Sequence, residues 1–139
     1  MGLSEQVKNF LNEKDRFCKV NGIQLVHISP GYAEAEMTVT ENSLNGADVV
    51  QGGAIFTLAD FTFAGAANAG GGQCVSLNCS ISFIRPGMPP LMRAVAREIS
   101  RGKTTAVYQI EVFNADGKLA AVMTANGFVT GRTMPPPED

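Results

Sequence analysis

Hydrophobic and polar residues alternate along much of the chain with a period of two, which is typical of a β-strand with one buried face. In residues 33–40, alanine, methionine and valine occupy the odd-numbered positions, and glutamate and threonine occupy the even-numbered ones. Residues 75–83 alternate in the same way, so we expect their apolar side chains on one face and Ser76, with the other polar residues, on the opposite face. The pattern predicts further strands at residues 23–29, 91–100, 104–113 and 118–130.

Two segments depart from this alternation and predict helices. In residues 4–18, apolar side chains recur at helical intervals, and Ser4 is a suitable N-cap. Residues 51–69 are apolar on all sides except for Asp60 and a few small polar groups, which predicts a central helix covered on every side. A membrane span is the alternative, but Asp60 at its midpoint would cost about 3 kcal/mol there. The glycines at 70–72 indicate where this helix ends.

The order of these elements predicts an α+β fold. A helix at about residues 3–18 precedes two strands, the buried helix and a four-stranded antiparallel meander with hairpin turns at 100–103 and 116–117. We expect the sheet to wrap around the long central helix in a single domain spanning residues 1–139, with a frayed tail at residues 133–139.

Composition narrows the possible functions. The 139 residues carry a net charge of −2, which gives no general reason to bind nucleic acid. There is one histidine, and Cys74 and Cys79 are expected on opposite faces of a strand, so we expect no metal site. Neither a G-x-S-x-G motif nor a complete phosphate-binding loop occurs. Three cysteines and the lack of an apolar leader favour a cytoplasmic location.

Asp60 is the strongest candidate for chemistry, because it is the only charged residue between Val49 and Ile84. Burial raises a carboxyl pKa, which suits a general base or a nucleophile; a structural carboxylate is the alternative. Gly52 and Gly53 open the same helix, where free N–H groups can stabilise an oxyanion; tight packing of the turn is the alternative. Gly52 and Asp60 lie about 12 Å apart along one helix. A site that uses both must therefore combine two chains.

The segment LNGADVVQGGAIFTLADFTFAGAANA, with VSLNCSISFIRPG, the RGKT turn and NADGKLAAVMTANGFV, resembles the hotdog-fold acyl-CoA thioesterases of the PaaI-like branch, related to phenylacetyl-CoA thioesterase. The resemblance covers residues 20–131 in matching order. It implies that Asp60 is the catalytic carboxylate and that the backbone N–H of Gly52 polarises the thioester carbonyl. It also implies that Asn45 orients the thioester or the attacking water, and that Ser76 positions this water.

One position departs from the family pattern, which has histidine before the two glycines where this chain has Gln51. Glutamine cannot carry charge near neutral pH, so we expect Gln51 to orient the loop or the substrate. Gly53 is expected to contact the substrate. Three basic residues are candidates for the phosphates of coenzyme A, with ordinary solvated charges as the alternative for each: Arg85, Arg101 and Lys103.

We therefore expect an enzyme that hydrolyses a small acyl-CoA thioester, such as phenylacetyl- or hydroxyphenylacetyl-CoA. Coenzyme A is part of the substrate, and no separate cofactor, nucleic acid or membrane partner is expected. The resemblance implies a homodimer with sites at its interface, and pairing of dimers into a tetramer. The alternatives are a non-catalytic acyl-CoA-binding module and a hotdog dehydratase, which needs a histidine, whereas His27 lies far from the helix in sequence. Phe56, Phe61 and Phe63 could line an aromatic acyl pocket or belong to the core.

Overall fold

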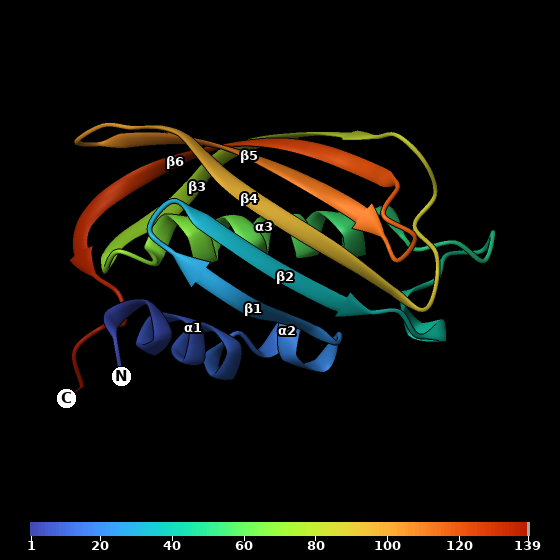
Figure 1. Ribbon diagram of the computed structural model, residues 1–139, viewed down its shortest axis with the longest axis horizontal. Coiled ribbons are helices and arrows are strands. Elements are labelled where there is room, and N and C mark those ends of the chain that lie inside the picture. The colour runs from blue at the N-terminus through green and yellow to red at the C-terminus, as the bar shows by residue number, and fades with distance from the viewer. Residues whose placement is uncertain (139) are drawn as a thin grey trace.

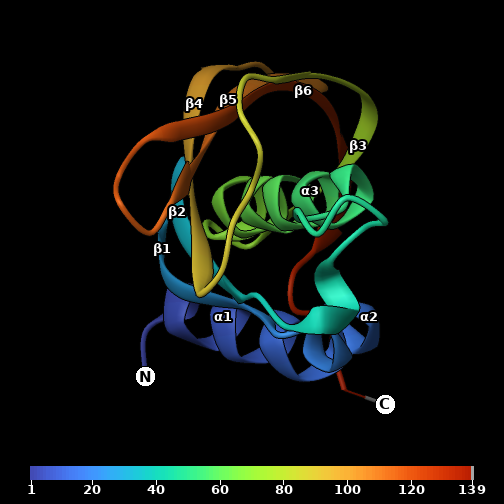
Figure 2. The same ribbon diagram turned by 90° about the vertical axis from the view of Figure 1, so that its right-hand side faces the viewer.

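The computed structural model describes residues 1–138, in which a curved antiparallel sheet wraps around a central helix, α3 (Figure 1). The sheet has six strands in the order β1-β2-β4-β5-β6-β3, and the short helices α1 and α2 lie on its open side (Figure 2). The elements are α1 Leu3–Lys14, α2 Arg16–Val20, β1 Ile23–Ser29, β2 Tyr32–Thr38, η1 Glu41–Ser43, α3 Gly52–Asn68, β3 Gly72–Phe83, β4 Leu91–Arg101, β5 Thr105–Asn114 and β6 Leu119–Thr133.

Helix α3 supplies the centre of the core because most of its side chains are apolar. Phe63 packs edge-on against the buried Tyr108 of β5, with ring centroids 5.4 Å apart. Gly65 lets the helix lie close to β1, since a Cβ there would come within 2.7 Å of Leu25. Burying an apolar side chain of the size of Phe63 stabilises the fold by about 1.5–3 kcal/mol. Tertiary packing therefore stabilises α3 more than its intrinsic helix propensity does.

Helix α3 is not covered on every side within the single chain, so this prediction from the sequence is wrong for the chain by itself. Gly53, Thr57, Asp60 and Ala64 are exposed or only half-buried. Residues three or four apart share a helix face, so these four form one continuous open stripe along α3. Of the three phenylalanines of the helix, Phe61 and Phe63 are buried in the core, whereas Phe56 is half-buried beside the stripe.

The predicted four-stranded meander is wrong for its first strand. Strands β4, β5 and β6 form consecutive hairpins, but β3 pairs with β6 at the far edge of the sheet, and β4 pairs with β2. The connection from β3 to β4, residues 84–90, contains three prolines. Because proline cannot donate a ladder hydrogen bond, this connection forms no tight hairpin. Strand β3 consequently keeps one unpaired edge within the described part of the chain.

The single N-terminal helix predicted from the sequence is instead two helices that meet at Asp15. Its carboxylate accepts a hydrogen bond from the Cys18 backbone N–H at 3.0 Å and so caps α2. The prediction that Ser4 is the N-cap of the first helix is also wrong, since Gly2 holds that position. The Ser4 hydroxyl donates to the Ala69 carbonyl at 2.8 Å and links α1 to the end of α3.

A β-bulge reverses the faces predicted for the start of β3. The register against β6 shifts just after Ser76, where Leu77 is the extra residue. Ser76 pairs with Gly127, and a Cβ on Gly127 would lie 3.1 Å from the Phe63 ring, so this face points toward α3. Paired residues of an antiparallel ladder share a face. Ser76 therefore lies on the helix-facing side together with Cys79, not on the opposite, polar face.

A polar network holds the C-terminal end of α3. The Arg101 guanidinium donates hydrogen bonds to the Ala67 carbonyl at 2.8 Å and to the Tyr108 hydroxyl at 3.1 Å. The Tyr108 hydroxyl in turn donates to the Glu98 carboxylate at 2.9 Å. Burial raises the pKa of Tyr108 to about 12, so this hydroxyl remains a donor at neutral pH. The cation also complements the negative end of the helix dipole.

The end of the chain is ordered further than predicted. Gly71 ends the α3 segment with φ of 92°, and its carbonyl accepts a hydrogen bond from the Met134 N–H at 2.8 Å. The frayed tail predicted from residue 133 is therefore wrong for Thr133 and Met134, and Asp139 lies outside the described residues. Within residues 1–138, no helix is long and apolar enough to cross a membrane.

We expect Tyr108→Phe to lower the free energy of unfolding by about 1–3 kcal/mol, because it leaves Arg101 and Glu98 without their shared partner. Urea denaturation measures the change. Tyr32→Phe is the matched control, because the ring contacts of Tyr32 with His27 and Arg97 do not need its hydroxyl. Equal losses in the two variants would contradict a stabilising role for the network.

Candidate active site

Gln51 caps the N-terminus of α3. Its side-chain Oε1 accepts a hydrogen bond from the Ala54 N–H at 3.2 Å, and its own backbone N–H donates to the Ser43 carbonyl at 2.8 Å. Glutamine is not among the preferred N-cap residues, which are Ser, Thr, Asp and Asn. The cap needs Gly53, since a Cβ there would come within 2.6 Å of the Gln51 Oε1. The sequence analysis did not predict this capping role.

The backbone N–H groups of Gly52 and Gly53 have no hydrogen-bond acceptor within residues 1–138. The first N–H groups of a helix lack intrahelical acceptors and lie at the positive end of its dipole. They are therefore available to stabilise an oxygen that gains negative charge.

The loop before α3 is folded by Asn45. Its side-chain Oδ1 accepts hydrogen bonds from the N–H groups of Ala47 at 2.8 Å and Val49 at 3.3 Å. The turn also contains Asp48 with φ of 61°, a left-handed conformation that is uncommon for residues other than glycine. Because the side-chain oxygen of Asn45 already accepts these two hydrogen bonds, only the side-chain N–H groups of Asn45 remain to contact a substrate.

Asp60 lies half-buried in the middle of the open stripe on α3. Burial, with a smaller contribution from the negative charge of Asp15, raises the pKa of its carboxyl group. The negative charge of Asp60 also adds to burial in raising the thiol pKa of Cys18 on α2 and of Cys79 on β3. The carboxylate makes no ion pair among the described residues. The raised pKa predicted for Asp60 is therefore confirmed.

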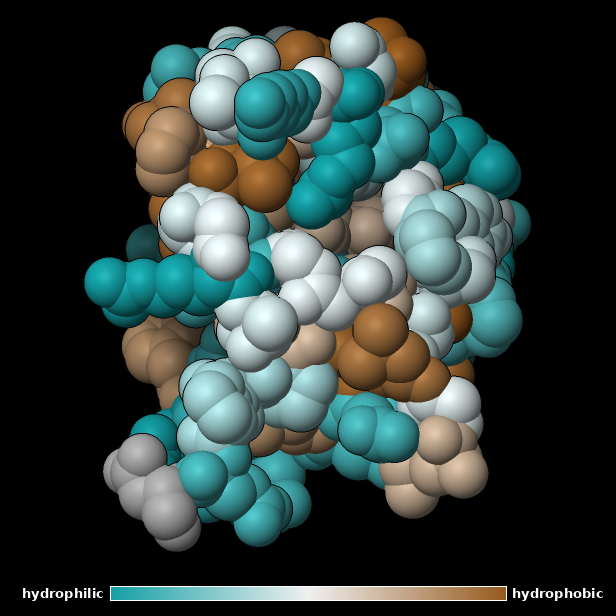
Figure 3. Space-filling view, turned by 90° about the vertical axis from the view of Figure 1, so that its left-hand side faces the viewer, coloured by the Kyte–Doolittle hydropathy of each residue, from teal (hydrophilic) through white to brown (hydrophobic). Residues whose placement is uncertain are grey.

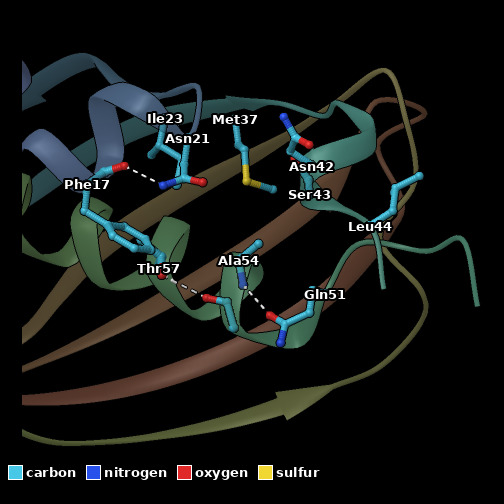
Figure 4. Close-up of a pocket in the computed structure, with 11 residues that line it drawn as sticks. Phe17, Asn21, Ile23, Met37, Asn42, Ser43, Leu44, Gln51, Ala54 and Thr57 are labelled. Carbon is cyan, nitrogen blue, oxygen red and sulfur yellow. Dashed lines mark hydrogen bonds between the residues drawn. The ribbon is translucent and has the colours of Figure 1, made fainter. Parts of the chain in front are cut away.

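A cavity of about 400 Å³ lies beside the start of α3 (Figure 4). Among its lining residues, only Gln51 and Gly53 were predicted from the sequence to belong to the site, and those from α2, β1, β2 and η1 were not. No local pattern distinguishes these residues, since four separate segments reach the cavity only after folding. The lining residues are Phe17, Asn21, Ile23, Met37, Asn42, Ser43, Leu44, Gln51, Gly53, Ala54 and Thr57.

Only one of the three basic candidates lies near the helix start. Arg85 and Gly52 line a second, more open hollow of about 350 Å³, and the Arg85 guanidinium donates to the Leu119 carbonyl at 2.9 Å. Arg101 binds the other end of α3, and Lys103 is exposed in the adjacent turn. That end of the molecule presents interspersed polar and apolar side chains (Figure 3). Within one chain, Arg101 and Lys103 are thus separated from Gly52 by the length of the helix.

The described residues contain no group of three or more His, Cys, Asp or Glu side chains that could hold a metal ion. His27 lies on β1, with its ring centroid 6.0 Å from that of Tyr32. The chemistry available at the start and middle of α3 is therefore that of backbone N–H donors and one carboxylate with a raised pKa.

A helix enclosed by an antiparallel sheet and carrying this chemistry defines a hotdog-fold thioesterase, the class predicted from the sequence. Residues 47–121 match the family model of the thioesterase superfamily. This range includes the end of the loop before α3, α3 itself and β3. The chain belongs to this superfamily.

Individual relatives agree with this assignment. The chain is 37% identical over 123 residues to the acyl-coenzyme A thioesterase PaaI of Escherichia coli K12, covering 88% of each protein. The structure of the E. coli PaaI protein of the phenylacetic acid degradation operon matches with a TM-score of 0.89 and 35% identity, over 95% of this chain and 99% of that one. The Streptococcus mutans protein smu.793, solved bound to acetyl CoA, matches with a TM-score of 0.74 and 29% identity, over 78% and 89%.

The pairing of Gln51 with Gly53 predicts a coupled effect on stability. Replacing a glycine within a helix by alanine raises the free energy of unfolding by roughly 0.5–1 kcal/mol. Gly53→Ala, however, also displaces the Gln51 cap, and loss of a cap lowers the free energy of unfolding by about 0.5–2 kcal/mol. In the Gln51→Ala background this loss has already occurred. We therefore expect Gly53→Ala to be more favourable by about 1 kcal/mol in that background than in the native chain, as measured by a double-mutant cycle of urea unfolding. Additive effects would contradict the cap.

The raised pKa of Asp60 predicts a stability gain from Asp60→Asn at neutral pH. Below the ordinary carboxyl pKa of 3.8, Asp60 is protonated in both the folded and the unfolded state, so its burial costs no stability there. As pH rises through the raised folded pKa, the folded state loses stability relative to the unfolded one. Asp60→Asn removes this penalty, and unfolding curves at acidic and neutral pH should reveal a gain only at neutral pH. A gain of the same size at both would contradict the burial effect.

Proposed function

We propose that this thioesterase hydrolyses acyl-CoA thioesters to a free acid and coenzyme A, with each active site built from two chains. The observation that carries the proposal is the start and the open stripe of α3: the unbonded N–H groups of Gly52 and Gly53 lie at one end, and the Asp60 carboxylate lies eight and seven residues further on, with a raised pKa and no ion pair within residues 1–138. The substrate class is supported by the name of the E. coli relative and by the acetyl CoA bound to the S. mutans one.

The need for a second chain follows from the helix geometry. Gly52 and Asp60 on one helix are about 12 Å apart, which is too far for both to act on one carbonyl group. Two copies of α3 packed antiparallel through their stripes bring Gly53 of one copy opposite Asp60 of the other, with the two-fold axis beside Phe56 and Thr57. Such packing also covers the stripe that the single chain leaves open.

Strand β3 supports the same arrangement. It is 12 residues long, and its outer edge has no partner within the described residues. Val75, Leu77 and Phe83 on this strand are 44%, 59% and 54% exposed. Unprotected strands of this length tend to pair with another chain. Antiparallel pairing of two β3 strands would extend the sheet across a dimer, while Ser76 faces the helix side.

Within this dimer, Asp60 acts as general base or as nucleophile. As base, its carboxylate takes a proton from water while the water oxygen bonds to the thioester carbon, and the oxyanion is stabilised by the Gly52 N–H of the other copy. The C–S bond then breaks, and the thiolate of coenzyme A takes a proton, giving the thiol and the acid. As nucleophile, the Asp60 carboxylate bonds to the thioester carbon and the C–S bond breaks, releasing the thiolate of coenzyme A, which takes a proton. Water then hydrolyses the resulting anhydride to the free acid and the regenerated Asp60 carboxylate. Asn45 and Ser76 orient the thioester or the water.

The cavity beside Gln51 has room for a small acyl group, and an aromatic one such as phenylacetyl or hydroxyphenylacetyl suits its mixed lining. Arg85 is the best placed of the three basic residues to contact a CoA phosphate, because it lies next to Gly52. A dimer of dimers and a cytoplasmic location stay predictions, as does the absence of a cofactor.

Two inactive variants test whether the site is shared. We expect Asp60→Asn to lower kcat at least about 100-fold, since it removes the base or nucleophile while leaving binding of the CoA ester intact. Gly52→Pro removes only an unbonded N–H, and proline is tolerated at the first helical position after the extended Gln51. It should lower kcat about 100-fold as well.

Mixing the two variants by refolding together should restore activity to about a quarter of the native value, since half of the dimers gain one intact site of two. Chromatographic detection of free acid from a panel of acyl-CoA esters measures this, with each variant refolded alone as the control. No recovery in mixed dimers would place Asp60 and Gly52 in one chain. Binding of CoA esters without any turnover by the native protein would favour a non-catalytic acyl-CoA-binding module.

A further inference from the structure

We propose that Asn21 determines acyl specificity by selecting acyl groups that carry a hydrogen-bond donor, such as a ring hydroxyl, at the end farthest from the thioester. The inference rests on the proposed function and extends it from the reaction to the acyl group. No sequence pattern indicated a role for Asn21, which caps the C-terminus of α2.

The cavity of about 400 Å³ is placed to receive an acyl group. Its floor is the first part of α3, with Gly53, Ala54 and Thr57, so it begins where the free N–H groups would hold the thioester carbonyl. The volume falls in the range of roughly 300–1,000 Å³ that is usual for small-molecule sites. Coenzyme A would then extend away from the cavity, toward the hollow that contains Arg85.

The walls of the cavity are apolar in the middle. Phe17, Ile23 and Met37 line it from three elements, and Figure 4 places the Phe17 ring beside Thr57. Phe17 is 62% exposed in the chain alone, so an apolar group bound against its ring would remove aromatic surface from water. This part of the cavity therefore suits a ring or a short aliphatic chain.

The far end of the cavity is polar and fixed. The Asn21 Nδ2 donates to the Phe17 carbonyl at 2.8 Å, which orients the amide group. Its Oδ1 then points into the cavity, away from Phe17 (Figure 4), and accepts no hydrogen bond within residues 1–138. By contrast, the Thr57 hydroxyl already donates to the Gly53 carbonyl at 2.8 Å. The group left free at this end is thus an acceptor held in one orientation.

A fixed acceptor discriminates between acyl groups of similar size. Asn21 is exposed in the chain alone, so a bound acyl group must displace water from its Oδ1, and a hydroxyl at the end of this group can then donate to that oxygen. A hydrogen atom or a methoxy group in its place leaves this oxygen without a partner, which lowers kcat/KM for that ester. The expected preference is about tenfold, which corresponds to about 1.4 kcal/mol.

Three thioesters test the proposal: phenylacetyl-, 4-hydroxyphenylacetyl- and 4-methoxyphenylacetyl-CoA. For the native protein we expect kcat/KM to be about tenfold higher for the hydroxylated ester than for the other two. Asn21→Leu should abolish this preference by lowering kcat/KM for the hydroxylated ester, whose hydroxyl loses its acceptor, and by raising it for the other two, which no longer leave an oxygen without a partner. Asn42→Leu, at the η1 side of the same cavity, is the matched control and should retain the preference. Asn21→Ala replaces Asn21→Leu if the leucine variant does not fold.

The outcomes separate the two proposals. Hydrolysis of all three esters with a ratio that Asn21→Leu leaves unchanged would overturn the role of Asn21 and leave the thioesterase proposal intact. Absence of hydrolysis of any ester would overturn the proposed activity. In that case the affinities of the three esters, measured by titration calorimetry on the same variants, decide the role of Asn21: a tenfold preference that Asn21→Leu removes supports it, and equal affinities contradict it.

Discussion

The structure depends on burying a helix that has almost no polar face. Helix α3 is covered by an antiparallel sheet that curves around it, and by α1 and α2 on the open side (Figure 2). The cover is incomplete along one stripe, which contains Asp60. The carboxylate is therefore partly desolvated yet reachable, and this partial burial raises its pKa. The proposed dimer completes the cover with a second copy of the same stripe, so stability and catalysis would depend on the same contact.

The candidate site consists largely of polar groups that have no partner among residues 1–138. These are the N–H groups at the start of α3, the Asp60 carboxylate and the Asn21 Oδ1. None of these groups is fully buried, since Gly52 and Asp60 are half-buried and Gly53 and Asn21 are exposed, so each of them can be reached by a ligand. Gln51 contributes to this pattern by capping the helix through Ala54 while leaving the two glycine N–H groups free. Its role as a cap needs no charge.

Most of the elements could be predicted from the sequence because their patterns are local. The alternation in β2, the apolar run of α3 and the turns of the later hairpins each depend on neighbouring residues. Two predictions were wrong because one residue breaks a helix or shifts a strand while the hydrophobic pattern around it continues. Asp15 ends one helix by capping the next, and Leu77 adds one residue to β3, which turns Ser76 toward α3.

The sequence by itself determined that a lone carboxylate lies in the middle of an apolar helix that opens with two glycines. This was sufficient to predict a raised pKa, free N–H groups and, from the helical rise, a site that needs two chains. Only the tertiary structure decided which edge β3 occupies, which side Ser76 faces and which residues line the cavity with Asn21. These features depend on contacts between segments far apart in the chain, and such contacts form only when the sheet curves around α3.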